Sequence, residues 1–388
     1  MGKRTLRTKL CDMLHIEYPI LSAGMGPALL GEQPGAPVEL VVAVSEAGGC
    51  GVLGAAAYTI DELREHIREI KAQTDKPFGV DMLLPKYVYG KPSDEDASEE
   101  DATQKISFSA ILQGIPKAHR EWVEKIYQEM GLPDMELMIN RNTTITMPQK
   151  AIQVCLEEKI PLFCAGLGSP GFMVEDAHDV GTKVLAITGN VKNAKRMAQT
   201  GIDLLVAQGH EAGGHTGRIG TLALIPQVID AAGPVPILAA GGIGDGRGLA
   251  AALAMGCIGV WVGTRFLVTN EGGAHEVSKR RIIESTDEDT RVSRAYTGKT
   301  ARASYNRFHD IWDDSGLESL PFPTQVLISS ALLASFHEAE KYEYVGGFAG
   351  QVSGLIKEIK PAGQVLEDMV EEAVDILTRK LPENVIAK

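Results

Sequence analysis

Short apolar segments alternate with amphipathic segments along most of this chain, and this alternation limits the possible folds more than any other feature. Eight apolar segments are expected to be strands: residues 19–23, 51–54, 78–84, 161–165, 183–187, 203–207, 235–239 and 259–262. Several, such as KVLAI and VPILA, are nearly continuous apolar runs, as in strands buried on both faces of a parallel sheet. The segment after the second strand begins with a helix-capping pattern, in which Thr59 precedes Glu62 by three residues. The alternation predicts an α/β fold, a (β/α)8 TIM barrel, with an open doubly wound sheet as the alternative.

A long segment interrupts the alternation after the third strand. Residues 86–146 exceed the usual length of a loop between a strand and a helix. They include an acidic run at 93–101 and an expected helix at about 118–130. We predict an insertion at the face of the barrel where the active site forms, with its helical half covering the site or a neighbouring subunit.

A second region, 271–388, follows the eighth strand and is expected to be helical, especially at 320–342 and 362–377. We therefore predict two domains. The first is a barrel over residues 1–270, including the insertion. The second is a C-terminal helical subdomain over residues 271–388, packed on the barrel.

Composition argues against several classes of protein. The net charge of −13 disfavours nucleic acid or an anionic membrane as a partner. No apolar run reaches the roughly 18 residues of a membrane span, and no apolar signal sequence follows Met1, so we expect a cytoplasmic protein. The five cysteines are scattered without a C-x-x-C pair, which predicts reduced thiols and no metal site.

The segment QGHEAGGHTG, after the sixth strand, contains the strongest catalytic candidate. Gly213 and Gly214 lack a Cβ, so the backbone can approach a flat ligand closely. His215 follows at the C-terminal end of a barrel strand, where barrel enzymes carry catalytic groups, and an imidazole can take a proton from a carbon acid at neutral pH. We predict that His215 is the catalytic base. His210 is the alternative within the motif and is expected to shape the pocket; a purely structural loop histidine is the other interpretation.

Glycine-rich turns after the last two strands predict a phosphate site. The seventh strand ends in AAGGIG, which includes Gly241 and Gly242, and the eighth ends in GTRF, which begins with Gly263 and Thr264. In barrels, the loops after strands seven and eight commonly bind phosphate through backbone N–H groups and a short helix. The alternative is that these glycines only form tight turns.

Two further segments are candidates for ligand contact. Gly24 and Met25 follow the first strand, where a flexible thioether can contact an aromatic ring. Asp81 lies within the third strand among apolar neighbours, where an acid is costly unless it is paired or reaches the barrel mouth. The alternatives are a core methionine and a buried acid satisfied by backbone amides.

Together these segments resemble the nitronate monooxygenase family, formerly called 2-nitropropane dioxygenases. The matching motifs are PILSAGM, GVDMLLP, QGHEAGGHTG, ILAAGGIGDGRGLAAALAMG and GVWVGTRFL, and TGKTARASYN is similar to the family's G-x-x-A-R segment. The match covers most of residues 10–310. The chain departs from the family at Asp81, where members often carry Asn, and in the length of the insertion at 86–146.

The resemblance implies an FMN-dependent oxidoreductase with non-covalent FMN and His215 as the base. It implies flavin-ring contacts from Gly24, Met25, Gln208 and Gly213, and phosphate contacts from Gly241, Gly242, Gly263 and Thr264. The further candidates for cofactor binding are Asp81, Gly214, Arg265 and Phe266. The implied reaction is oxidation of alkyl nitronates, or a similar carbon acid, with O₂ to a carbonyl compound and nitrite.

Other functions stay open on the sequence. One is an NAD(P)H-dependent FMN reductase of the same superfamily, either a quinone reductase or an enoyl-acyl-carrier-protein reductase, because the same loops serve all of these enzymes. Another is a barrel that binds a phosphate ligand without redox chemistry or delivers a flavin to a partner protein. The sequence also leaves open a homo-oligomer.

Overall fold

Eight parallel strands form one sheet in the order β1-β11-β10-β8-β7-β6-β3-β2. The strands are β1 (Ile20–Ser22), β2 (Gly51–Gly54), β3 (Phe78–Leu83), β6 (Leu162–Leu167), β7 (Lys183–Thr188), β8 (Leu204–Gln208), β10 (Ile237–Ala240) and β11 (Gly259–Val262). The amide of Cys50 donates to Ile20 O (3.0 Å) and that of Ser22 to Cys50 O (3.1 Å), so the two edge strands meet and the sheet closes. The predicted (β/α)8 barrel is confirmed.

This computed structural model describes residues 5–27, 33–56, 58–84, 103–107, 115–133, 136–140, 147–322 and 324–386. The predicted acidic run at 93–101 lies outside these residues. Within the described part of the chain, no helix is both long and apolar enough to cross a membrane.

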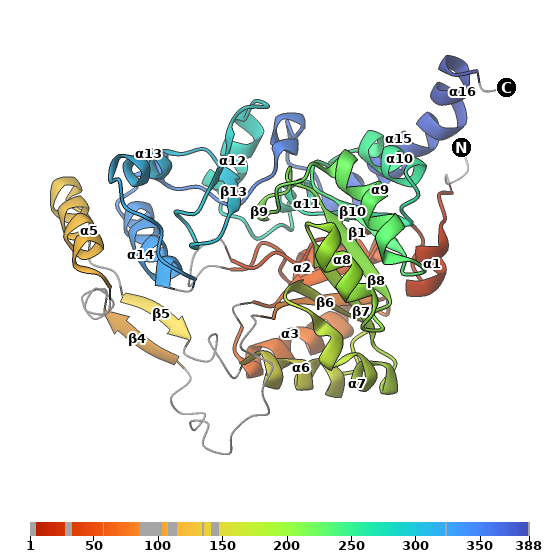
Figure 1. Cartoon of the computed structure of the whole chain (residues 1–388), viewed down its shortest axis with the longest axis horizontal. Helices are drawn as coiled ribbons and strands as arrows, with labels where there is room; N and C mark the ends of the chain where they lie inside the picture. The colour runs from red at the N-terminus through yellow and green to blue at the C-terminus, as the bar shows by residue number, and fades with distance from the viewer. Residues whose placement is uncertain are drawn as a thin grey trace.

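Eight helices surround the barrel (Figure 1). They are α2 (Val38–Glu46), α3 (Ile60–Gln73), α6 (Met147–Glu157), α7 (Val174–Asp179), α8 (Val191–Ala198), α9 (Thr221–Ala232), α10 (Gly246–Ala254) and α15 (Ala362–Asp375). The predicted capping box at Thr59 and Glu62 begins α3. Helix α15 packs on α10 and α2 and takes the eighth place in the ring. Its residues Val365, Leu366 and Met369 join the core between sheet and helices, so this core extends well past residue 270.

The inside of the barrel forms a second core. Leu21, Val52, Val206 and Trp261 fill its middle, and α1 (Lys9–Leu14) closes one end with side chains that include Leu10. At the other end, where the strands finish, the residues that line the interior are small or polar: Ala23, Asp81, Gly166, Gln208, Ala240 and Gly263. Because these side chains do not fill the barrel mouth, a cavity is left there.

The chain between α11 (Thr264–Leu267) and α15 forms a separate layer with its own core. It contains α12 (Glu276–Glu284), β12 (Thr290–Ser293), β13 (Ala301–Ser304), α13 (Arg307–Asp314) and α14 (Thr324–Glu338). The region that was expected to be helical therefore also includes two antiparallel strands. The division into two domains stays a prediction.

The insertion contributes a helix to this layer. Helix α5 (Lys117–Met130), close to the predicted bounds, lies beside α13 and α14 in Figure 1, and its Val123 and Ile126 share their core. Tyr127 Oη lies 2.6 Å from Ser335 Oγ on α14. The insertion also forms a two-stranded sheet of β4 (Thr103–Ser107) and β5 (Glu136–Asn140). The described residues of α5 do not line the cavity, so the expected contact of this helix with the site is not seen. The alternative, contact with a neighbouring subunit, stays a prediction. Helix α5 packs on α14, which does line the cavity.

Candidate active site

A cavity of about 440 Å³ lies at the C-terminal ends of the barrel strands. The barrel provides its floor, and α14 together with the loop around Phe348 provides part of its wall. Most of the predicted site residues line it: Gly24, Met25, Asp81, Gln208, Gly213, Gly214, His215, Gly241, Gly242, Gly263 and Thr264. The structure thus brings together loops that are separated by more than two hundred residues in the sequence.

Arg265 and Phe266 do not line the cavity. Phe266 is fully buried in the core between sheet and helices. Arg265 is buried and its Nη2 donates to the backbone oxygens of Val268 (3.2 Å) and Glu358 (3.1 Å). The first turn of α11 therefore directs Thr264 toward the cavity and the next two side chains into the protein, where they fix the loop.

Strand pairing positions His215. Gly214 and His215 form the short strand β9, which pairs antiparallel with β13 and places His215 opposite Ala301. Gln208 Nε2 donates to His215 O (2.8 Å), which ties this strand to the end of β8. Nε2 of His215 lies 3.0 Å from Thr297 Oγ1. The pairing therefore joins the GGH motif to the TGKTAR segment, and their shared edge faces the cavity.

His215 is neutral at neutral pH. Burial lowers the pKa of the imidazole to about 4, and the positive charge of Lys299 acts in the same direction. The hydroxyl of Thr297 can donate to Lys299 O (3.3 Å) while it accepts from Nε2 of His215. In that arrangement Nδ1 carries no proton, and a neutral imidazole with an open nitrogen can act as a base.

His210 lies outside the cavity and holds the loop. Its Nδ1 is 2.7 Å from Gly217 O, and its backbone oxygen accepts from Nε (3.2 Å) and Nη2 (3.1 Å) of Arg302. Arg302 is the arginine of the G-x-x-A-R segment, and it is buried. These contacts fit the prediction that His210 shapes the pocket.

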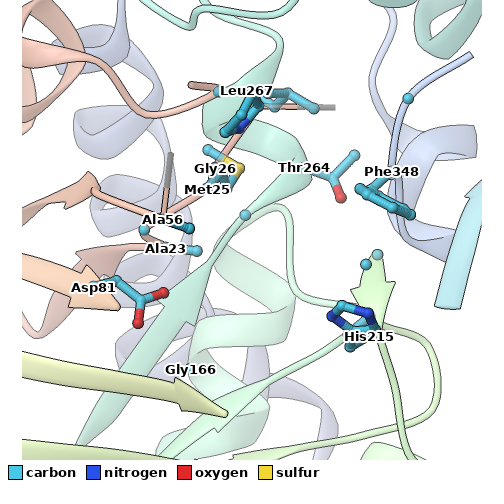
Figure 2. A pocket seen from close by; sticks show the side chains of 18 of the residues that line it. Ala23, Met25, Gly26, Ala56, Asp81, Gly166, His215, Thr264, Leu267 and Phe348 are labelled. Carbon is cyan, nitrogen blue, oxygen red and sulfur yellow. The ribbon is translucent and has the colours of Figure 1, made fainter. Parts of the chain in front are cut away.

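The loops after β10 and β11 meet at another part of the cavity. Gly241 and Gly242 have φ values of 91° and 72°, which other residues rarely adopt, so this turn depends on glycine. Thr264 Oγ1 accepts from Gly350 N (2.9 Å), which leaves the hydroxyl proton for a ligand. Figure 2 shows this hydroxyl close to Phe348. Backbone amides and one hydroxyl form the kind of site that binds a phosphate group.

Asp81 lies across the cavity from His215 (Figure 2). Its side chain is 8% exposed, and burial raises the pKa of its carboxyl group well above the usual range. Within the described part of the chain its Oδ1 has no hydrogen-bond partner. Met25 lies above it in Figure 2, on the loop after β1.

The sequence reasoning missed the contribution of the C-terminal layer. Thr297 and Lys299 line the cavity beside His215, as do Phe348 and Gly350. The glycine-rich run GGFAG, at 346–350, was the available signal, since such a run is unusual in a region expected to be helical. A Cβ on Gly213 would lie 2.7 Å from the backbone carbon of Ala349, so this loop packs directly on the GGH motif.

A closed barrel with a histidine and two glycine-rich loops at its mouth defines a (β/α)8 enzyme with a cofactor-sized cavity. The chain belongs to the nitronate monooxygenase family, whose model matches residues 7–372. Proteins of this family are oxidoreductases and in general flavoproteins, so the chain is an oxidoreductase that acts on a small molecule.

Several proteins are similar to it over nearly the full length. Rv1533 of Mycobacterium tuberculosis, a monooxygenase by name, is 36% identical and the match covers 95% of this chain and 97% of that one. The structure of FabK from Thermotoga maritima is 31% identical, covers 98% of this chain and 100% of that chain, and has a TM-score of 0.74. Nitroalkane oxidase from Streptomyces ansochromogenes is 27% identical, with 95% and 99% covered and a TM-score of 0.75.

Proposed function

We propose that this protein oxidises alkyl nitronates, or the carbon acids that yield them, with FMN and O₂ to a carbonyl compound and nitrite. The observation that carries the proposal is a neutral histidine, His215, at the edge of a cavity that glycine-rich loops also line. The nitroalkane oxidase of Streptomyces ansochromogenes has the same fold at 27% identity, which supports this substrate class.

The cavity has the features that FMN requires. Gly24, Gly213 and Gly214 leave flat backbone surfaces for a planar ring, and Met25 offers a thioether beside them. Gly242, Gly263 and Thr264 would hold the single phosphate. The flavin, when bound, would supply the electron transfer of the reaction.

In the proposed reaction, the side chains of the protein accept the acidic proton of the substrate and stabilise the anion that remains. The neutral imidazole of His215 accepts the acidic proton of a nitroalkane, and an anionic product beside the ring then raises the pKa of the imidazole, so the proton stays there. The ammonium group of Lys299 attracts the same anion. The apolar walls of the C-terminal layer, such as Phe348 and Leu333, exclude water from the reacting carbon.

A second function, NAD(P)H-dependent reduction of an enoyl thioester or a quinone by the flavin, is favoured by one observation. The apolar side chains of Phe322, Val326 and Leu327 also line the cavity, which suits a substrate with an apolar chain. The similarity to FabK points in the same direction.

The decisive experiment measures the cofactor and the turnover of the purified protein. We expect a yellow protein that releases FMN on denaturation and forms nitrite from ethylnitronate and O₂ without added NAD(P)H. Release of FAD, or a colourless protein, would contradict the cofactor. Rapid NADPH consumption with an enoyl thioester or a quinone, and no nitrite from nitronate, would replace the reaction by the second one.

A His215→Asn variant, with His210→Asn as the matched control, tests the base in the same assay. Loss of a positioned base lowers kcat/KM by about 10²–10⁴-fold with a neutral nitroalkane, and the loss should be smaller with a preformed nitronate. His210→Asn should have a milder effect, because His210 lies outside the cavity. Flavin reduction at the wild-type rate by neutral nitroalkane in His215→Asn would show that another group is the base.

A further inference from the structure

Asp81 is a buried acid in the cavity wall that the proposed proton transfer does not use. It lies on β3, 8% exposed, with its carboxyl group directed into the cavity (Figure 2). Its Oδ1 is buried and has no hydrogen-bond partner among the described residues. A buried polar atom left without a partner is unfavourable. Asp81 also lines the cavity, so a ligand there can contact the carboxyl group.

The surroundings of Asp81 hold the carboxyl group in this orientation. A Cβ on Gly24 would lie 2.2 Å from the Cβ of Asp81, and a Cβ on Gly166 would lie 3.1 Å from its Oδ1. Both neighbours are glycines, so the acid is accommodated without a side chain against it. The cavity is the remaining open side of the group.

Among the residues that the structure describes, no cation balances this acid. Burial is the main cause that raises the pKa of Asp81, and only the amides of Gly166 and Met82 act in the opposite direction. Across the β3–β6 pair the facing titratable group is the thiol of Cys164, which is itself buried and whose pKa is raised. On the β2 side the partner is Gly54, which has no side chain. Burial without a balancing charge favours the protonated, neutral form of this acid.

We propose that Asp81 binds the cofactor as a neutral carboxylic acid, its hydroxyl donating to a carbonyl oxygen and its own carbonyl accepting from the adjacent N–H of a planar imide. This inference rests on the proposed function for the flavin, whose ring carries such an edge. The pairing transfers no proton and needs no co-reactant. A carboxylate could not form it, because it lacks the donor and would repel the carbonyl oxygen of the ligand.

The protonation state can be read directly in the holoenzyme. We expect the infrared spectrum at neutral pH to contain the C=O band of a protonated carboxyl group that shifts in D₂O and is absent from Asp81→Asn. A spectrum in which Asp81→Asn removes only carboxylate bands would overturn the proposal. This infrared measurement does not depend on catalytic turnover.

The contact to the cofactor is tested by FMN affinity across the pH range. The dissociation constant is measured by quenching of flavin fluorescence with the wild type, Asp81→Asn and Asp81→Leu. The amide of Asn donates and accepts a hydrogen bond at every pH. The FMN affinity of Asp81→Asn should therefore change with pH only through the other ionisable groups, which are the same in all variants. The wild type should match it at neutral pH and then weaken at alkaline pH, by up to about tenfold per pH unit for one proton. Asp81→Leu should bind weakly at every pH.

Two results in this series would refute the role of Asp81. One is a ratio of wild-type to Asp81→Asn affinity that does not change with pH. The other is FMN binding by Asp81→Leu as tight as by Asp81→Asn, which would show that the side chain does not touch the cofactor. A protein that binds no flavin in any variant would instead refute the proposed function, so the two failures are distinguishable.

Discussion

Two basic side chains share one end of the cavity in different charge states. His215 is neutral, because burial and the nearby Lys299 lower the pKa of its imidazole to about 4. Lys299 is half-buried, its Nζ lies 4.8 Å from the ring centre of Phe322, and within the described residues no carboxylate pairs with it. A substrate becomes an anion when it gives its proton to the neutral imidazole of His215. The unpaired ammonium group of Lys299 can then stabilise this anion.

This arrangement predicts the pH dependence of the reaction. With a neutral nitroalkane, kcat/KM should fall as the pH drops through the pKa of His215, because the protonated imidazole cannot accept a proton. Lys299→Met removes a positive charge, so the pKa of His215 should rise and the fall should move to higher pH, by up to about one unit. Lys299→Arg keeps the charge and serves as the control. If kcat/KM falls at the same acidic pH in Lys299→Met and in the wild type, Lys299 does not lower the pKa of His215.

At the scale of secondary-structure elements, the short strand β9 positions His215 in the site. Its pairing with β13 places His215 next to Thr297 and Lys299, which lie about eighty residues later in the chain. Helix α14 forms the cavity wall, and α5 from the insertion packs behind it. The insertion thus affects the site through the position of α14.

A substitution in α5 tests this support. Val123 is fully buried against the C-terminal layer, so Val123→Ala should lower the local stability by about 1–3 kcal/mol. Hydrogen exchange should become faster in α14 and stay unchanged in β8. Lys125→Ala, on the exposed face of the same helix, is the control. Equal protection of α14 in both variants would show that α5 does not stabilise it.

The sequence predicted the elements with a local signature. The eight strands were visible because strands buried on both faces are continuous apolar runs, and α3 was visible through its capping box at Thr59. The side chains beside His215 were not predicted, because Lys299 and Thr297 reach it through β9–β13 pairing, which depends on residues far apart in sequence. The place of α15 was missed for the same reason: an amphipathic helix does not reveal which surface it covers.

On the scale of the whole molecule, the two ends of the barrel have separate tasks. The N-terminal end is filled by apolar side chains and closed by α1, where Leu10 is fully buried and packs against Gly259. The C-terminal end is left open by small and polar residues and carries the cavity. Stability and function can therefore be altered separately.

Leu10→Ala should destabilise the protein by about 2–5 kcal/mol, since it leaves a void beneath the barrel. The midpoint of denaturant unfolding should fall, while kcat and flavin content of the folded protein stay at wild-type values. Lys9→Ala, on the exposed side of α1, should leave the midpoint unchanged. A loss of flavin from folded Leu10→Ala would show that the two ends are coupled.

The position of α15 also determines when the protein can be completed during synthesis. The last barrel strand ends at Val262, but the helix that closes the ring between α10 and α2 begins at Ala362. Until α15 has been synthesised, the growing chain therefore exposes an apolar seam between α10 and α2. Gly350, which packs on Gly213 in the cavity, emerges equally late. The cavity is therefore complete only after the chain has been synthesised through the loop that contains Gly350.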